Sequence, residues 1–264
     1  MRCLVGALLA GLCLQTQAGP DFLPQAQAYL VEADGRILWE RNADRPLPPA
    51  SLTKLMTALL VQERGALDRE VTVDRAAAME TGSRLGLAPG DRLKAADLMA
   101  AALIQSANDA CHALADWVAG DEARFVALMN ARARQLGLAS TRFTNACGHD
   151  QPGHRASARD LAALATLALA VPEIARLVAL PELAIATTNG RRTFRLTNKN
   201  ALIGRYPGAQ GVKSGYTQQA GKCLIAAAQR DGHRVLLVLL NAPNRWWDAS
   251  DSLDRAFAEL RQPT

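Results

Sequence analysis

The chain has 264 residues, of which 49% are hydrophobic and 21% are charged. This composition is typical of a globular protein that is long enough to bury a substantial core, and it excludes a disordered, collagen-like or coiled-coil chain. The formal net charge of +5 is scattered along the sequence without a basic block. Such a charge favours loose attraction to anionic surfaces and does not indicate nucleic-acid binding.

Residues 1–18 predict a secretory signal peptide. Arg2 supplies a short positive start, residues 3–14 form an uncharged apolar run, and small residues stand at the cleavage positions before Ala18. The run is too short to span a membrane as a stable helix, so we expect cleavage after Ala18. A buried N-terminal helix is the alternative, and Leu12 disfavours a lipid on Cys13.

In chain order, the first predicted element is a hairpin over residues 27–40 with Asp34-Gly35 as its turn. A proline-rich segment follows, and Ser51 is the expected N-cap of a helix over residues 52–63 that Gly65 ends.

The middle of the chain is rich in alanine and leucine at helical spacing. Residues 74–91 are expected to form a surface loop with a helical turn at one rim of a cleft, and residues 140–156 to be irregular. The predicted helices span residues 94–105, 108–119, 121–136 and 157–170.

The C-terminal part returns to strands. A strand over residues 212–216 precedes a hairpin of residues 222–228 and 235–240, and a helix over 246–260 closes the chain. Strands near both ends with helices between them predict an α+β fold. We expect one antiparallel sheet built from both ends of the chain, flanked by helices, with an inserted all-helical lobe.

Cys111, Cys147 and Cys223 remain after the predicted cleavage. None forms a CxxC pair or a cluster with histidine. One pair could close as a disulfide, but we expect buried thiols that behave as small hydrophobic side chains. His149 and His154 flank a loop without the spacing of metal ligands, so neither a metal nor another cofactor is expected.

The motif that carries chemistry is Ser51-Leu52-Thr53-Lys54 at the start of a predicted helix. Positions i and i+3 share one helix face, so the amine of Lys54 can lie against the hydroxyl of Ser51. A serine needs a base to become nucleophilic, and burial or a nearby cation can lower the pKa of a lysine enough for that task. Alone, this motif also fits an N-cap serine beside a solvent-facing lysine.

Two further motifs favour the catalytic interpretation of Ser51 and Lys54. Ser106-Ala107-Asn108 precedes a predicted helix, and Lys213-Ser214-Gly215 lies on an edge-type strand. The trio resembles that of low-molecular-mass penicillin-binding proteins of the D-alanyl-D-alanine carboxypeptidase family, which share the serine β-lactamase/DD-peptidase-like fold. The resemblance covers roughly residues 25–260, with the most similar segments at 49–57, 103–115, 136–160 and 211–217.

The resemblance implies roles for individual residues. It makes Ser51 the nucleophile, Lys54 its base, Ser106 the proton shuttle to the leaving amine, Asn108 the holder of the substrate amide, and Lys213 a second positive charge. It implies that Ser214, Gly215 and Tyr216 bind the extended substrate, that the N–H groups of Ser51 and Tyr216 stabilise the oxyanion, and that Arg245 meets the substrate carboxylate.

The implied substrates are peptidoglycan stem peptides, with β-lactams as covalent inhibitors, in the periplasm or cell-envelope space. Ser214 replaces the usual threonine and keeps its hydroxyl. Many relatives continue into a β-rich domain and a membrane anchor. Here we expect a single catalytic domain over residues 19–264, with neither of these and no integral membrane segment after cleavage.

Three other functions compete with the carboxypeptidase. A class A β-lactamase is disfavoured because no Glu-x-x-Leu-Asn pattern lies between the second and third motifs. An endopeptidase that cleaves peptidoglycan crosslinks would use the same residues and remains the main alternative. A non-catalytic binding domain is disfavoured because every catalytic position is intact.

Overall fold

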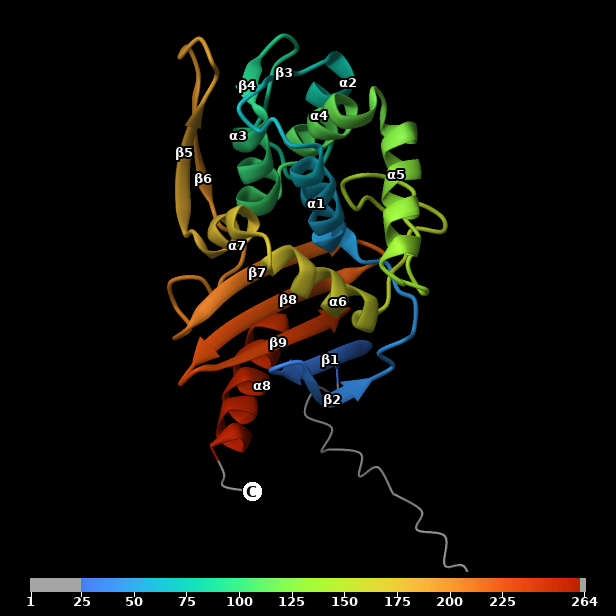
Figure 1. Cartoon of the computed structure of the whole chain (residues 1–264), viewed down its shortest axis with the longest axis vertical. Coiled ribbons are helices and arrows are strands. Elements are labelled where there is room, and N and C mark those ends of the chain that lie inside the picture. The colour runs from blue at the N-terminus through green and yellow to red at the C-terminus, as the bar shows by residue number, and fades with distance from the viewer. Residues whose placement is uncertain (1–24, 262–264) are drawn as a thin grey trace, which may run out of the picture.

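The computed structural model describes residues 25–261, so the predicted signal peptide and Cys13 lie outside the described residues. A five-stranded sheet forms the base of the molecule (Figure 1), and every pairing in it is antiparallel. Its strands, in spatial order, are β2 (Arg36–Arg41), β1 (Ala28–Ala33), β9 (His233–Leu240), β8 (Gly221–Arg230) and β7 (Ala209–Thr217). The pairing of β1 with β9 joins the two ends of the chain, as the sequence predicts.

The central strands are buried on both faces, because helices cover each side of the sheet. Val238 faces the core with helix α6 (Ala158–Leu169), while its neighbour Leu237 faces the core with α8 (Arg245–Leu260). Alternate side chains therefore enter different cores, which explains the nearly continuous apolar run of β9. Helices α6 and α8 lie on opposite faces in Figure 1.

The helical lobe lies above the sheet in Figure 1. Two small two-stranded sheets border the lobe. The predicted helices 94–105, 108–119, 121–136 and 157–170 are confirmed to within about two residues. The elements of the lobe are α1 (Lys54–Arg64), β3 (Glu70–Thr72), α2 (Arg75–Ala78), β4 (Arg92–Lys94), α3 (Ala95–Ala100), the π-helical turn η2 (Ala101–Gln105), α4 (Asn108–Ala119) and α5 (Glu122–Gln135).

Several predictions of local structure were incomplete or wrong. Ser51 is not an N-cap, because it lies inside a 3-10 turn, η1 (Ala50–Thr53), that runs into α1 without a side-chain cap. Helix α7 (Pro172–Ala179) and the hairpin of β5 (Glu182–Ala186) and β6 (Thr193–Thr197) were not predicted. Their segments are short, so the apolar periodicity is weak, although a proline at the first helical position is a recognised start signal.

The expectation of free thiols was also wrong for two cysteines. Cys111 on α4 and Cys147 form a disulfide, with their Cα atoms 5.9 Å apart, whereas Cys223 is a buried free thiol. The partners are 36 residues apart in the sequence. Their proximity depends on how residues 145–150 fold back against α4, and cysteine spacing carries no information on that contact.

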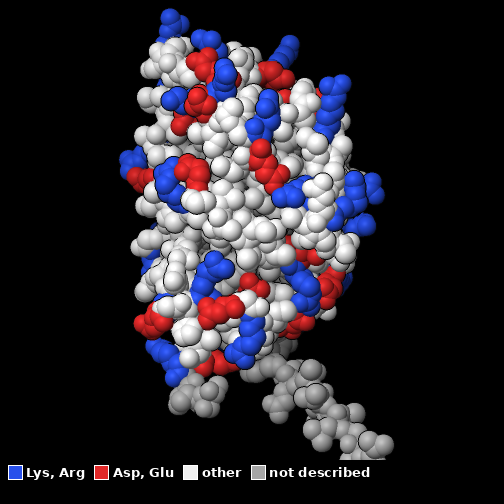
Figure 2. Space-filling view, viewed as in Figure 1, with Lys and Arg blue, Asp and Glu red and all other residues white. Residues whose placement is uncertain are grey.

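Positive and negative side chains are interspersed over the face drawn in Figure 2, in agreement with the scattered charge of the sequence. Within residues 25–261, no single helix has the length and apolarity needed to cross a membrane. Helices α6 and α7 reach those limits only as a pair, and they meet at an angle of 104°.

Candidate active site

A cleft of about 430 Å³ opens between the edge strand β7 and the helical lobe. Its lining comes from the 3-10 turn η1, the start of α4, the strand β7 and the start of α8. The structure therefore brings the three motifs together, with the side chains of Lys54 and Lys213 buried behind the lining. The predicted residues that line the cleft are Ser51, Ser106, Asn108, Ser214, Tyr216 and Arg245.

Two glycines let the backbone of Ser51 lie between the lobe and the sheet. A Cβ on Gly148 would collide with the carbonyl oxygen of Ala50, and Gly148 has a φ of +90° that other residues rarely adopt. A Cβ on Gly215 would lie 2.9 Å from the amide nitrogen of Ser51. The absent side chain of Gly215 thus makes room for the turn that carries Ser51.

Lys54 lies directly beneath Ser51. Its Nζ is 3.0 Å from the Ser51 Oγ, and it also donates to the Asn108 Oδ1 at 2.7 Å and to the carbonyl oxygen of Cys147 at 2.6 Å. Three oxygens from three separate segments therefore fix the position of one nitrogen. The side chain cannot swing away from Ser51 without leaving two buried acceptors unpaired.

The surroundings of Lys54 also set its protonation. The residue is 0% exposed, and this burial lowers the pKa of Lys54 to about 7 against the opposing effect of the Glu80 and Asp109 carboxylates. An ordinary lysine is protonated at neutral pH. Lys54 is instead neutral in a large fraction of molecules there, and only a neutral amine can accept a proton from Ser51.

Ser106 and Lys213 form a second serine–lysine pair. Ser106 occupies the left-handed region with a φ of +62°, which a non-glycine residue adopts at some energetic cost, and its Oγ accepts from the Lys213 Nζ at 2.9 Å. Lys213 also donates to the carbonyl oxygen of Ser214 at 2.8 Å. Burial, followed by the charges of Lys54 and Arg245, lowers the pKa of Lys213 well below its ordinary value.

Asn108 has both ends of its amide engaged. The Oδ1 holds Lys54, and the Nδ2 donates to the carbonyl oxygen of Thr81 at 2.6 Å. The side chain lines the cleft but binds the protein on both sides. Its contact with a substrate amide therefore stays a prediction, and its observed role is to hold Lys54.

Arg245 is at the cleft, as the resemblance implies, but its guanidinium is partly committed. Its Nη1 donates to the carbonyl oxygens of Gly215 and Cys223, and the group stacks over Trp246 at 4.6 Å from the ring centroid. The Nε is buried and has no hydrogen-bond partner within residues 25–261. Arg245 thus ties α8 to strands β7 and β8 and keeps its Nε donor unused.

Comparisons with known proteins establish the family and the fold of this chain. Residues 15–244 match the sequence profile of the Peptidase S11 family, described as D-alanyl-D-alanine carboxypeptidase. This chain belongs to the Peptidase S11 family. It is 35% identical to the D-alanyl-D-alanine carboxypeptidase DacF of Bacillus subtilis, over 98% of this chain and 72% of that protein.

Two further relatives match over most of their length. The D-alanyl-D-alanine endopeptidase of Pseudomonas aeruginosa is 32% identical, over 97% of this chain and 82% of that protein. A solved D-alanyl-D-alanine carboxypeptidase from Mycobacterium tuberculosis has a TM-score of 0.83 at 33% identity, over 89% of this chain and 91% of that one. The predicted family and fold are therefore confirmed.

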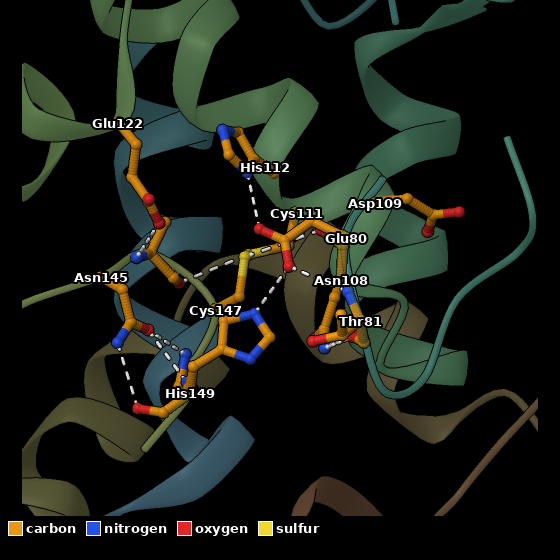
Figure 3. A network of polar contacts seen from close by, with 12 residues as sticks. Glu80, Thr81, Asn108, Asp109, Cys111, His112, Glu122, Asn145, Cys147 and His149 are labelled. Carbon is orange, nitrogen blue, oxygen red and sulfur yellow. Dashed lines mark hydrogen bonds and ion pairs between the residues drawn. A yellow bond between two sulfur atoms is a disulfide. The ribbon is translucent and has the colours of Figure 1, made fainter. Parts of the chain in front are cut away.

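Sequence reasoning missed several residues around the site of this Peptidase S11 chain. Glu80 accepts a hydrogen bond from His112 at 2.6 Å and forms an ion pair with His149 at 2.9 Å, so it lies between α4 and the cleft (Figure 3). The Asp109 carboxylate accepts from three successive backbone amides, those of residues 85–87. The position of Asp109 directly after the second motif was a usable signal, whereas nothing in the sequence marks Cys147 as a ligand of Lys54.

Proposed function

We propose that Ser51 is the nucleophile and Lys54 its general base in a serine-type D-Ala-D-Ala carboxypeptidase. The observation that carries this proposal is the 3.0 Å contact between the Ser51 Oγ and the buried Lys54 Nζ, whose pKa lies near 7. Neutral Lys54 takes the proton of Ser51 as the Oγ attacks a carbonyl carbon. The N–H groups of Ser51 and Tyr216 would stabilise the oxyanion.

The substrate is the pentapeptide stem of peptidoglycan, which ends in D-Ala-D-Ala. Attack on the penultimate D-Ala carbonyl forms an ester with Ser51, and the peptide C–N bond breaks. The terminal D-Ala leaves after its amine receives a proton through Ser106, which Lys213 holds. Water then hydrolyses the ester and frees the serine.

The edge strand β7 would bind the substrate as an added strand, with Ser214, Gly215 and Tyr216 along it. Asn108 would contact the substrate amide, and Arg245 would lie near the terminal carboxylate. A β-lactam carbonyl resembles the scissile bond, but its leaving amine stays tethered, so β-lactams should acylate Ser51. We place this activity in the periplasm or cell envelope, in a single catalytic domain over residues 19–264.

An endopeptidase is the second candidate, because the Pseudomonas aeruginosa endopeptidase aligns over 97% of this chain. Mass spectrometry of the products from a pentapeptide muropeptide and from a crosslinked dimer distinguishes the two functions. Loss of one D-alanine from the pentapeptide, with the dimer intact, supports the carboxypeptidase. Cleavage of the dimer at the greater rate would make the endopeptidase the main activity.

The nucleophile has its own test. Intact-mass analysis after penicillin treatment should show a single adduct, which peptide mapping places on Ser51. An adduct that persists in the Ser51→Ala variant would overturn the assignment.

A further inference from the structure

The Cys111–Cys147 disulfide lies directly behind Lys54. Cys147 supplies the carbonyl oxygen that accepts from Lys54 Nζ at 2.6 Å. Cys111 is on α4, one turn after Asn108, whose Oδ1 accepts from the same nitrogen at 2.7 Å. Besides the Ser51 hydroxyl, two oxygens hold Lys54: one belongs to α4 and the other to the segment that carries Cys147. The disulfide joins these two segments covalently. Figure 3 shows this bond between α4 and the loop.

The segment that carries Cys147 has no regular secondary structure. We call residues 145–150 the cleft loop, because Cys147, Gly148 and His149 line the cleft. Side-chain ties hold the other positions of the cleft loop: the Asn145 Oδ1 accepts from two of its amides, and Asp150 accepts from Thr217. At Cys147 itself the covalent tie is the disulfide. Together with the hydrogen bond from the Gly148 N–H to Asn145, which belongs to the same peptide unit, it fixes where the Cys147 carbonyl oxygen points.

We propose that the Cys111–Cys147 disulfide is a positioning bond for acylation, which keeps the Cys147 carbonyl and the Asn108 amide on Lys54. The inference rests on the proposed roles of Ser51 and Lys54. A misplacement of about 1 Å can cost roughly 100-fold in rate, so a looser carbonyl should slow proton transfer from Ser51. Binding of the ligand in the cleft should change much less, because Cys111 and Cys147 are only 0% and 1% exposed.

The reduced protein has a means to stay folded. Reduction adds two electrons and two protons to the sulfur–sulfur bond, and each new thiol has a carbonyl oxygen within reach. Cys111 Sγ lies 3.3 Å from the oxygen of Ala146, and Cys147 Sγ lies 3.7 Å from the oxygen of Asn108. Reduction should therefore loosen the cleft loop without unfolding the lobe.

The test measures penicillin acylation, with the first-order acylation constant separated from the dissociation constant of the preceding non-covalent complex. We compare the oxidised protein, the protein reduced by dithiothreitol and the Cys111→Ala/Cys147→Ala variant. Reduction and the double substitution should each lower the acylation constant by roughly 10- to 100-fold and leave the dissociation constant within about threefold. Re-oxidation should restore the wild-type rate, and dithiothreitol should not affect the double variant.

Asp160→Ala is the matched control. Asp160 accepts from the backbone of Ser140 and the hydroxyl of Thr141, so it holds the start of the same irregular segment, outside the cleft loop. Its acylation constant should stay within about threefold of wild type. An equal fall in Asp160→Ala and in the cysteine variant would show general loosening and overturn the proposal, as would unchanged acylation after reduction.

Parallel measurements on Ser51→Ala and Lys54→Ala keep the two proposals apart. If these variants are not acylated while the reduced protein reacts at the wild-type rate, only the positioning inference fails. If Ser51→Ala is still acylated, the proposed function fails.

Discussion

Two buried lysines behind the lining of the cleft look alike and differ in their surroundings. Lys54 is 0% exposed and Lys213 is 1% exposed, and each contacts a serine hydroxyl at about 3 Å. Lys54 has two further oxygen acceptors, and the carboxylates of Glu80 and Asp109 act to raise its pKa. Lys213 has one further acceptor, and its charged neighbours are the cations Lys54 and Arg245.

In the proposed mechanism, this difference gives one residue type two tasks. Burial lowers the pKa of both lysines, but only Lys54 has nearby carboxylates that oppose the effect and keep its pKa near 7. A group with that pKa can gain and lose a proton at neutral pH, as a general base must. Lys213 lacks such a partner, so an anionic substrate group would supply the charge that favours its protonated form.

The largest expected effect comes from Lys54. Lys54→Arg should slow penicillin acylation by about 10²–10⁴-fold, as much as Lys54→Ala, because a guanidinium stays protonated and cannot accept the serine proton. Time-resolved mass spectrometry of the adduct measures the rate. Acylation of Lys54→Arg within tenfold of wild type would mean that this lysine is not the base.

Lys213 should show a smaller and substrate-dependent effect. Lys213→Ala should slow cleavage of a pentapeptide with a free carboxylate by roughly 10- to 100-fold, the value of a charge-assisted hydrogen bond. A carboxyl-amidated peptide should lose less, because it offers no charge to Lys213. Cleavage rates on the acid and the amidated peptide test this prediction. Equal losses would mean that Lys213 acts only by holding Ser106, without binding the carboxylate, and would contradict the proposed difference between the two lysines.

Substitution of Arg245 tests whether a second cation binds the terminal carboxylate of the substrate. Arg245→Ala should slow cleavage of the acid by roughly 10-fold and hardly affect the amide, since a guanidinium suits a carboxylate. The structure also gives Arg245 a tie to the carbonyl oxygens of Gly215 and Cys223. Equal loss on the acid and the amide, measured with matched peptides, would show that this tie is its whole role.

The smallest effect concerns the charge on Glu80. In the wild type, acylation should rise with pH as Lys54 loses its proton, with half of the maximal rate near pH 7. The Glu80 carboxylate raises the pKa of Lys54, so Glu80→Gln should lower it and move this midpoint to lower pH by less than about one pH unit. Rate–pH profiles of penicillin acylation measure the midpoint.

Asp116→Asn is the control for that profile. Asp116 contacts His112, as Glu80 does, but it is not among the charges that shift the pKa of Lys54. Its midpoint should equal that of the wild type. A midpoint of Glu80→Gln that stays in place or moves to higher pH would contradict the electrostatic account of Lys54.

The sequence by itself determined most of the elements and the residues proposed to react. Apolar periodicity located the longer helices, and Asp34-Gly35 located the first turn, because local spacing reflects which face of an element is buried. The three motifs identified Ser51, Lys54 and Lys213, because their chemistry depends on residue type and short spacing. The hairpin pattern at the C-terminal end also placed Lys213 on an edge strand, as the sheet order confirms.

Only the tertiary structure decided how those groups are tuned. The pKa of Lys54 depends on burial and on two carboxylates, of which Glu80 is 26 residues away in the sequence. Three features depend on where the cleft loop lies. They are the disulfide partner of Cys111, the carbonyl oxygen that holds Lys54, and the close contact with Ala50 that requires a glycine at position 148. Desolvation and contact are properties of distant segments brought together, so no local pattern along the chain encodes them.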